Sequence, residues 1–259
     1  MIRLDVDARG VATLTLARAD KHNALSQAMI DDLTQMAARI AADRTIRVVV
    51  LAADGPTFCA GGDLGWMRDQ IAGDTAQRRA AAVSLAGMLQ ALNTLPQPIV
   101  GRLQGNAFGG GVGLACICDV AIAADHARFG LTETRLGLIP ATIGPYVLAR
   151  IGEGYARRVF MSGRMFNAAE AVTLGILARA VPAGDLDAAI AGEVAPYLSC
   201  GPVAVAAAKR FARSLGPVID AETIARSVDA LIAVWDGPEA KEGISAFFDK
   251  RSPQWTGSE

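Results

Sequence analysis

The chain has 259 residues, enough for one large domain whose core needs no disulfide or metal support. Lys and Arg number 25 against 26 Asp and Glu, and the formal net charge of −1 gives no electrostatic reason to expect nucleic acid or an anionic membrane as partner. The composition is 52% hydrophobic, which Ala-rich helices and subunit interfaces together would explain.

The first half of the chain predicts strands that alternate with helices. Alternating apolar and polar residues over 2–7 and 11–16 predict a β-hairpin, and Ser26 is placed to cap a helix that runs to about Ala42. The apolar run 46–53 is typical of a buried strand, and 99–103 and 120–124 are predicted as further short strands. Two further segments are expected to be helical: 77–94 and 111–116. This alternation indicates an α/β core.

Helical character dominates from about residue 149 onward. Five segments are predicted as helices: 168–174, 186–198, 203–215, 221–234 and 239–250. No linker, internal repeat or low-complexity tract separates them from the core. We therefore predict a core domain over 1–195 that holds the active site, followed by a helical oligomerisation region over 196–259 that packs on a neighbouring subunit.

The cysteines and the N-terminus favour a cytoplasmic protein. Four cysteines lie among apolar or small residues and are predicted to be free, reduced and buried: Cys59, Cys116, Cys118 and Cys200. Because two of them have C-x-C spacing and the chain has only two histidines, no metal site is expected. We see no secretory signal at the N-terminus, and no apolar run approaches the ~20 residues that span a membrane.

Two glycine-rich turns carry the strongest functional signal, FCAGGDL at 58–64 and NAFGGGVGL at 106–114. Each leads into the start of a predicted helix, where the backbone N–H groups have no intrahelical partner. Gly62 and Gly110 have no side chains, so a ligand can approach the main chain closely. If the turns face each other, their N–H groups converge on one point and can stabilise a carbonyl oxygen that gains negative charge.

Other chemistries fit these motifs poorly. The glycine run at 109–113 has Cys116 where a dinucleotide fingerprint needs a small packing residue, and no Gly-Lys-Ser/Thr completes a P-loop. His22 and His126, predicted as surface residues, lie near no G-x-S-x-G nucleophile elbow. Acid–base work therefore falls to a carboxylate, and Glu133 is the best candidate. Its neighbours Phe129 and Leu131 are expected to desolvate it and raise its pKa.

Asp63 is a second carboxylate near the first turn. It stands at the start of a predicted helix, so we expect it to act as the N-cap, with a substrate contact as the alternative.

In order and interval, these motifs resemble the enoyl-CoA hydratase/isomerase (crotonase) superfamily. The segments that carry the resemblance are KHNAL at 21–25, AGGDL at 60–64, GGG at 109–111, CD at 118–119, FGLTE at 129–133, LGLIP at 136–140 and EGISAFFDKR at 242–251. The resemblance implies an α/β spiral of ββα turns with a helical C-terminal region, assembled as a homotrimer or a dimer of trimers.

The resemblance also implies roles for particular residues. The N–H groups of Gly62 and Gly110 would form the oxyanion hole, and Glu133 would deliver the proton to the α-carbon. Six residues match positions at or near the bound acyl-CoA: Ala24, Ala60, Leu64, Gly113, Phe247 and Lys250. Phe247 and Lys250 match tail positions that reach the adenine and phosphates of a neighbour's ligand, although Lys250 could instead be a surface lysine. Coenzyme A belongs to the substrate, so no separate cofactor is expected.

Gly113 is the main departure from the family pattern. Hydratases of the best-known type use two glutamates, and Gly113 stands where the first, which activates water, would be. Isomerases of the superfamily often need one glutamate only. However, residues 111–114 and 132–147 look like bacterial methylglutaconyl-CoA-type hydratases, which act on branched or carboxylated enoyl-CoAs. A glycine at 113 is also expected to open space for a branched acyl group.

We therefore predict an enoyl-CoA hydratase that adds water to a 2-enoyl-CoA thioester. A double-bond isomerase that uses the same residues is the first alternative. A non-catalytic acyl-CoA-binding or RNA-binding member is the second, and the near-neutral charge argues against its RNA version.

Overall fold

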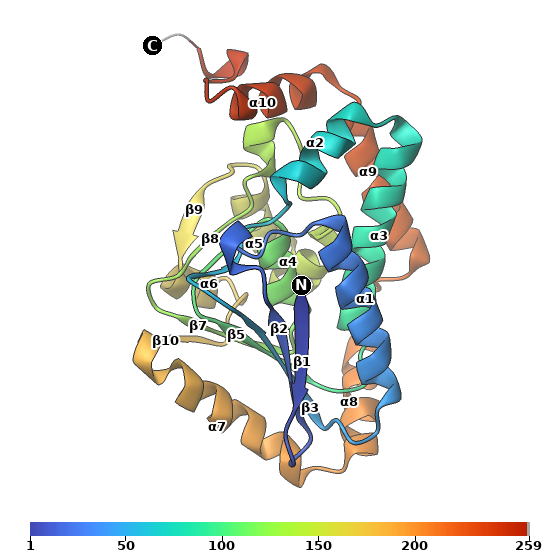
Figure 1. The fold of residues 1–259 in the computed structure, drawn as a ribbon, viewed down its shortest axis with the longest axis vertical. Coiled ribbons are helices and arrows are strands. Elements are labelled where there is room, and N and C mark those ends of the chain that lie inside the picture. Colours follow the sequence, from blue (N-terminus) through green and yellow to red (C-terminus); the bar gives the residue numbers. More distant parts are fainter. Residues whose placement is uncertain (258–259) are drawn as a thin grey trace.

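The computed structural model describes residues 1–257 and contains two β-sheets covered by helices (Figure 1). The strands of the larger sheet, in spatial order, are β1 (Ile2–Val6), β2 (Val11–Leu16), β3 (Val48–Ala53), β5 (Ile99–Leu103), β7 (Val120–Ala124) and β10 (Arg179–Val181). The strands of the smaller sheet are β4 (Thr57–Cys59), β6 (Asn106–Phe108), β8 (Arg128–Gly130) and β9 (Met165–Asn167).

The two sheets grow together along the chain. Each of three successive turns adds a strand to the larger sheet and then a strand to the smaller one: β3 and β4, β5 and β6, β7 and β8. One or two helices follow each pair, and all strand pairings in this part are parallel. The predicted α/β spiral of ββα turns is therefore confirmed.

Ten α-helices complete the described part of the chain. They are α1 (Gln27–Ala42), α2 (Leu64–Ala72), α3 (Thr75–Asn93), α4 (Gly110–Ile117), α5 (Gly144–Phe160), α6 (Ala168–Thr173), α7 (Leu186–Ser199), α8 (Pro202–Ser214), α9 (Ala221–Trp235) and α10 (Pro238–Phe248). All predicted helices are present within a few residues of their expected ends. The α3 helix begins earlier than predicted, because Asp74 and Gln77 exchange 2.8 Å bonds in a capping box.

The β3 strand shows why its sequence is continuously apolar. All six of its residues are buried, because helices cover both faces of the larger sheet. Val49 and Leu51 join the main core with α1, α3 and α4, whereas Val48 and Val50 pack against α7 on the opposite face. Figure 1 shows α7 crossing the sheet on the side away from α1 and α3.

The C-terminal helices have two different environments. The α9 and α10 helices pack on α3 and on residues 136–141 through a third apolar cluster that includes Leu231 and Trp235. By contrast, α8 has no buried residue, and Val203 and Phe211 are 80% and 66% exposed. The division into domains at residue 195 stays a prediction.

The cysteine prediction holds for three of the four residues. Cys59, Cys116 and Cys118 are free and buried, and burial raises the pKa of each thiol to about 12. Cys200 is free but exposed, so its predicted burial was wrong. It lies just after α7, where the chain turns at the surface into α8.

No single helix within residues 1–257 is long and apolar enough to cross a membrane. One bent pair, Ala183–Ser199 with Pro202–Ser214, meets the length and composition criteria only when the two helices are taken together.

Candidate active site

The site lies where three parallel strands of the smaller sheet end. Because β4, β6 and β8 are parallel neighbours, the segments that follow them emerge at the same edge. Gly62 follows β4, Gly110 follows β6 and Glu133 follows β8. Each turn of the spiral therefore supplies one of the three residues that the sequence assigns to catalysis.

The N–H group of Gly62 is directed away from its neighbouring segment. Leu25 N–H donates to Gly61 O at 2.7 Å, and Asp63 N–H donates to Leu25 O at 3.0 Å. In this extended pairing the intervening Gly62 presents its N–H on the other side. Gly62 is exposed and lines the cavity described below.

The N–H group of Gly110 is the second main-chain donor. Gly110 is the first residue of α4, so its N–H has no intrahelical acceptor and stands at the positive end of the helix dipole. The two turns touch, since a Cβ added to Gly61 would lie 3.7 Å from Gly110 N. Glycine is also required at 109, where φ is +47° and a Cβ would lie 2.9 Å from Glu133 Oε1.

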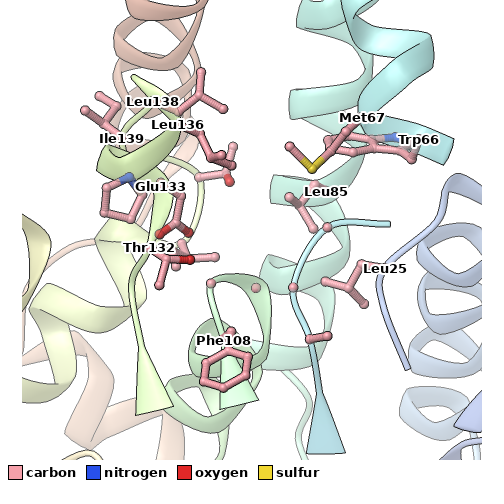
Figure 2. A pocket seen from close by; sticks show the side chains of 18 of the residues that line it. Leu25, Trp66, Met67, Leu85, Phe108, Thr132, Glu133, Leu136, Leu138 and Ile139 are labelled. Atoms are coloured by element: carbon pink, nitrogen blue, oxygen red, sulfur yellow. The ribbon is translucent and has the colours of Figure 1, made fainter. Parts of the chain in front are cut away.

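Glu133 places a desolvated carboxyl group beside these donors. It begins a short 3₁₀ turn after β8, and in Figure 2 it faces Leu25 and Leu85 across the cavity. Its Oε2 is buried and has no hydrogen-bond partner within residues 1–257. Burial raises the pKa of Glu133 from its ordinary 4.5 to about 7. A group with this pKa can both accept and donate a proton near neutral pH.

The cavity around these groups has a volume of about 530 Å³ and a largely apolar wall. Trp66, Met67 and Leu85 form the side opposite Glu133, as Figure 2 shows. The C-terminal helices close it with Leu231 and Trp235. Sequence reasoning did not single out these wall residues, because their apolar side chains resemble ordinary core residues.

The predicted site residues separate into two groups. Ala60, Gly62, Leu64, Gly110, Glu133 and Phe247 line the cavity, whereas Ala24, Gly113 and Lys250 do not. Ala24 is buried, and its carbonyl accepts a bond from Arg18 Nη1 at 3.2 Å. Lys250 is exposed just after α10. Phe247 lines the cavity of its own chain, where the family pattern placed it at a neighbour's ligand.

Gly113 does not open space for a branched acyl group, and that expectation was wrong. The residue is buried, and a Cβ added to it would lie only 2.5 Å from Ile143 Cγ2. Ile143 is itself buried and lines the cavity. The volume that a glutamate would occupy at 113 is therefore filled by the Ile143 side chain.

Asp63 acts as the predicted N-cap. Its Oδ1 accepts from Gly65 N at 2.8 Å and Trp66 N at 3.1 Å, and its Oδ2 pairs with Arg18 Nη1 at 2.7 Å. These bonds lower the pKa of Asp63 even though partial burial opposes them. Asp63 is therefore held as a carboxylate and is a poor proton carrier.

The remaining polar candidates lie at the surface. His22 and His126 are both exposed, as predicted. Within residues 1–257, no group of three His, Cys, Asp or Glu side chains is arranged to hold a metal ion.

A ββα spiral with two main-chain donors beside one desolvated carboxyl group is the architecture of a crotonase-fold enzyme. The model of the family "Enoyl-CoA hydratase/isomerase" matches residues 7–258. This chain therefore belongs to the enoyl-CoA hydratase/isomerase family.

Relatives and solved structures agree with this assignment. The chain is 32% identical to the 2,3-dehydroadipyl-CoA hydratase of Escherichia coli, covering 95% of each chain. It is 30% identical to the mitochondrial methylglutaconyl-CoA hydratase of Mus musculus, covering 98% of this chain and 82% of the relative. A crystal structure of an enoyl-CoA hydratase from Shewanella pealeana matches with 38% identity and a TM-score of 0.80, covering 98% and 95% of the two chains.

Proposed function

We propose that the chain is a 2-enoyl-CoA hydratase in which Glu133 carries every proton. The thioester oxygen would accept hydrogen bonds from Gly62 N–H and Gly110 N–H. The Glu133 carboxylate takes a proton from water while the hydroxide adds to C3, and the double-bond electrons move onto the thioester oxygen as an enolate. Glu133 then returns its proton to C2, which gives a 3-hydroxyacyl-CoA.

One observation carries this proposal, the desolvated carboxyl of Glu133 at the edge where both turns meet. Its pKa of about 7 allows the same group to act first as base and then as acid. The Ile143 side chain fills the position of a second acid, so the structure offers no separate group for water at that point. Coenzyme A enters as part of the substrate, and the scheme uses no further cofactor.

The residues that line the cavity favour a substrate with an apolar acyl chain. Apart from Glu133, the charged side chain that lines the cavity within the described residues is Arg135, which is exposed. Trp66, Leu231 and Trp235 would instead contact a hydrocarbon. The two relatives named above are called hydratases of dehydroadipyl-CoA and methylglutaconyl-CoA, so carboxylated substrates are the essential comparison.

A panel of enoyl-CoAs in ¹⁸O-labelled water tests the function. We expect ¹⁸O in the 3-hydroxyacyl product and a higher kcat/KM for apolar 2-enoyl-CoAs than for ω-carboxylated ones. Better turnover of the carboxylated series would contradict the apolar acyl site. Binding without turnover across the panel would refute the enzymatic proposal.

Isomerisation is the second candidate function, and the filled position at Gly113 favours it. Moving a proton between C4 and C2 of a 3-enoyl-CoA requires only one acid–base group, and Glu133 is such a group. In the same panel, this activity would move the double bond of a 3-enoyl-CoA without taking up ¹⁸O.

We further propose that the enzyme is a cytoplasmic homotrimer or dimer of trimers in which α8 contributes to the subunit contacts. Support comes from the exposed apolar side chains of α8 and the following loop, including Phe211, Leu215 and Val218. Sedimentation at micromolar concentration should give three or six times the chain mass, and a monomer would overturn this assembly.

A further inference from the structure

A second cavity lies away from the active site, between the C-terminal end of α3, the first half of α5, and α8. Its volume is about 690 Å³, and none of its lining residues lines the catalytic cavity. The segment 216–219 forms its rim, and Gln90 Nε2 holds that rim by donating to Ile219 O at 2.9 Å. In Figure 1, α8 lies beyond the end of α3 opposite α10.

The lining of this cavity is strongly cationic. Four basic residues and no acidic residue line it: Arg150, Lys209, Arg210 and Arg213. Asp119 lies behind the wall and pairs with Lys209 Nζ at 2.7 Å, while also accepting from Ile99 N. The Asp119 carboxylate is therefore already engaged by Lys209 and the main chain.

Within residues 1–257, none of the three arginines of the cavity forms an ion pair with a carboxylate. Arg150 donates to the carbonyls of Cys116, Cys118 and Asp119, which orients its guanidinium without neutralising it. Arg213 makes no side-chain hydrogen bond or ion pair within residues 1–257. Burial lowers the pKa of Arg213; the Asp119 carboxylate opposes this effect, and the charge of Arg150 adds to it.

Electrostatic repulsion between these cationic side chains is unfavourable, and a bound anion would reduce it. Guanidinium groups bind the oxygens of phosphate in a bidentate geometry, and partial desolvation strengthens this attraction. The volume exceeds what one phosphate needs and matches that of small-molecule sites. Pro217 and Ile219, which are exposed and partly exposed, add apolar surface to the same wall.

We propose that this cavity binds a phosphorylated small molecule, with the guanidinium groups of Arg213 and Arg210 facing its phosphate oxygens and Arg150 adding positive charge to the wall. The organic part would contact Pro217 and Ile219. This site is separate from the acyl-CoA cavity, so its occupancy does not require catalysis.

Calorimetric titration of the full-length protein with inorganic pyrophosphate and with ADP tests the proposal. Saturating S-butyrylpantetheine, which carries no phosphate and therefore does not compete for the proposed site, is present so that the acyl part of the catalytic cavity is filled. We expect one pyrophosphate per chain and tighter binding of ADP, because ADP adds an organic group. Arg213→Gln should weaken both about tenfold. The matched control Arg44→Gln changes an exposed arginine after α1 and should bind within twofold of wild type.

Arg213→Gln should remain folded, since its side chain makes no hydrogen bond within the described residues, and should keep wild-type turnover of enoyl-CoA. Arg210→Gln provides an independent variant at an exposed position of the same wall. No binding of either probe to wild type, or equal binding by both cavity variants and the control, would overturn the proposal. A smaller oligomer in Arg213→Gln without any probe binding would also overturn it, because the cations would then contact a second copy of the chain.

Discussion

The buried carboxyl of Glu133 makes a quantitative prediction about stability. Its pKa is raised from 4.5 to about 7, so the folded protein holds the proton more tightly than the unfolded chain does. The folded state therefore loses stability as the pH rises from about 4.5 to about 7. At about 1.4 kcal/mol per pH unit, the ionised group makes the folded state about 3 kcal/mol less stable above pH 7.

Glu133→Gln removes this ionisation and keeps the side-chain shape. The variant should gain about 3 kcal/mol relative to wild type between pH 4 and pH 8. Urea unfolding at several pH values measures this, and the change with pH matters more than the absolute difference, since the amide also lies buried. Glu153→Gln, at an exposed position on α5, is the control and should differ from wild type by no more than about 0.5 kcal/mol at every pH.

The same substitution should abolish hydration while acyl-CoA binding survives, because the main-chain donors remain. For wild type, kcat/KM should fall about tenfold per pH unit below about pH 7, where the required carboxylate becomes protonated. If the stability difference between Glu133→Gln and wild type stays constant from pH 4 to pH 8, the argument from burial is refuted. Near-normal turnover by the variant would refute the role of Glu133 in proton transfer.

Three further substitutions test the rest of the site. Gly110→Pro removes one of the two proposed oxyanion donors at a helix position that accepts proline. Its hydration rate should be about 10²–10³-fold below that of the control Gly110→Ala, and equal rates in folded variants would contradict the proposed oxyanion hole. Gly113→Glu should lower the free energy of unfolding by about 3 kcal/mol because of the contact with Ile143. Gly113→Glu combined with Ile143→Gly should recover stability and speed hydration of straight-chain enoyl-CoA. Thermal melts and hydration rates measure these effects, and an unchanged melting temperature in the single variant would contradict the contact. Asp63→Asn should retain turnover, because Asp63 acts as an N-cap. In urea unfolding, Asp63→Ala should be about 1 kcal/mol less stable than Asp63→Asn, because it loses the cap. Loss of turnover in Asp63→Asn would instead identify Asp63 as a proton carrier.

The long elements could be predicted from sequence because their patterns are local. The hairpin alternates apolar and polar residues, and β3 and β7 are apolar runs of five or more residues. Ser26 caps α1 through Met29 N as expected. The strands of the smaller sheet were not predicted. Each has three residues, too few to show alternation, and each is held by pairing with strands distant in the chain.

The candidate site was predictable where glycine or a carboxylate marks it. Gly62 and Gly110 stand out because glycine lets a ligand approach the main chain closely. Glu133 stands out because a carboxylate beside apolar residues can transfer protons. The space beside Gly113 could not be predicted, because Ile143 enters it from a segment thirty positions away, and packing of that kind leaves no local pattern. The place of Leu231 and Trp235 in the cavity wall was not predicted for the same reason. Helical spacing indicates that one face of α9 is buried, but it does not show which cavity that face borders.

Leu231, Trp235 and Phe247 complete the wall of a cavity whose reacting groups come from residues 62–133. During synthesis from the N-terminus, the spiral emerges and can fold before these three side chains leave the ribosome. At that stage the N–H groups of Gly62 and Gly110 and the carboxyl group of Glu133 would face water directly. The apolar wall that would contact an acyl chain is complete only when α9 and α10 are in place. A chain that terminates before these helices should therefore fold its core but leave the site open and inactive.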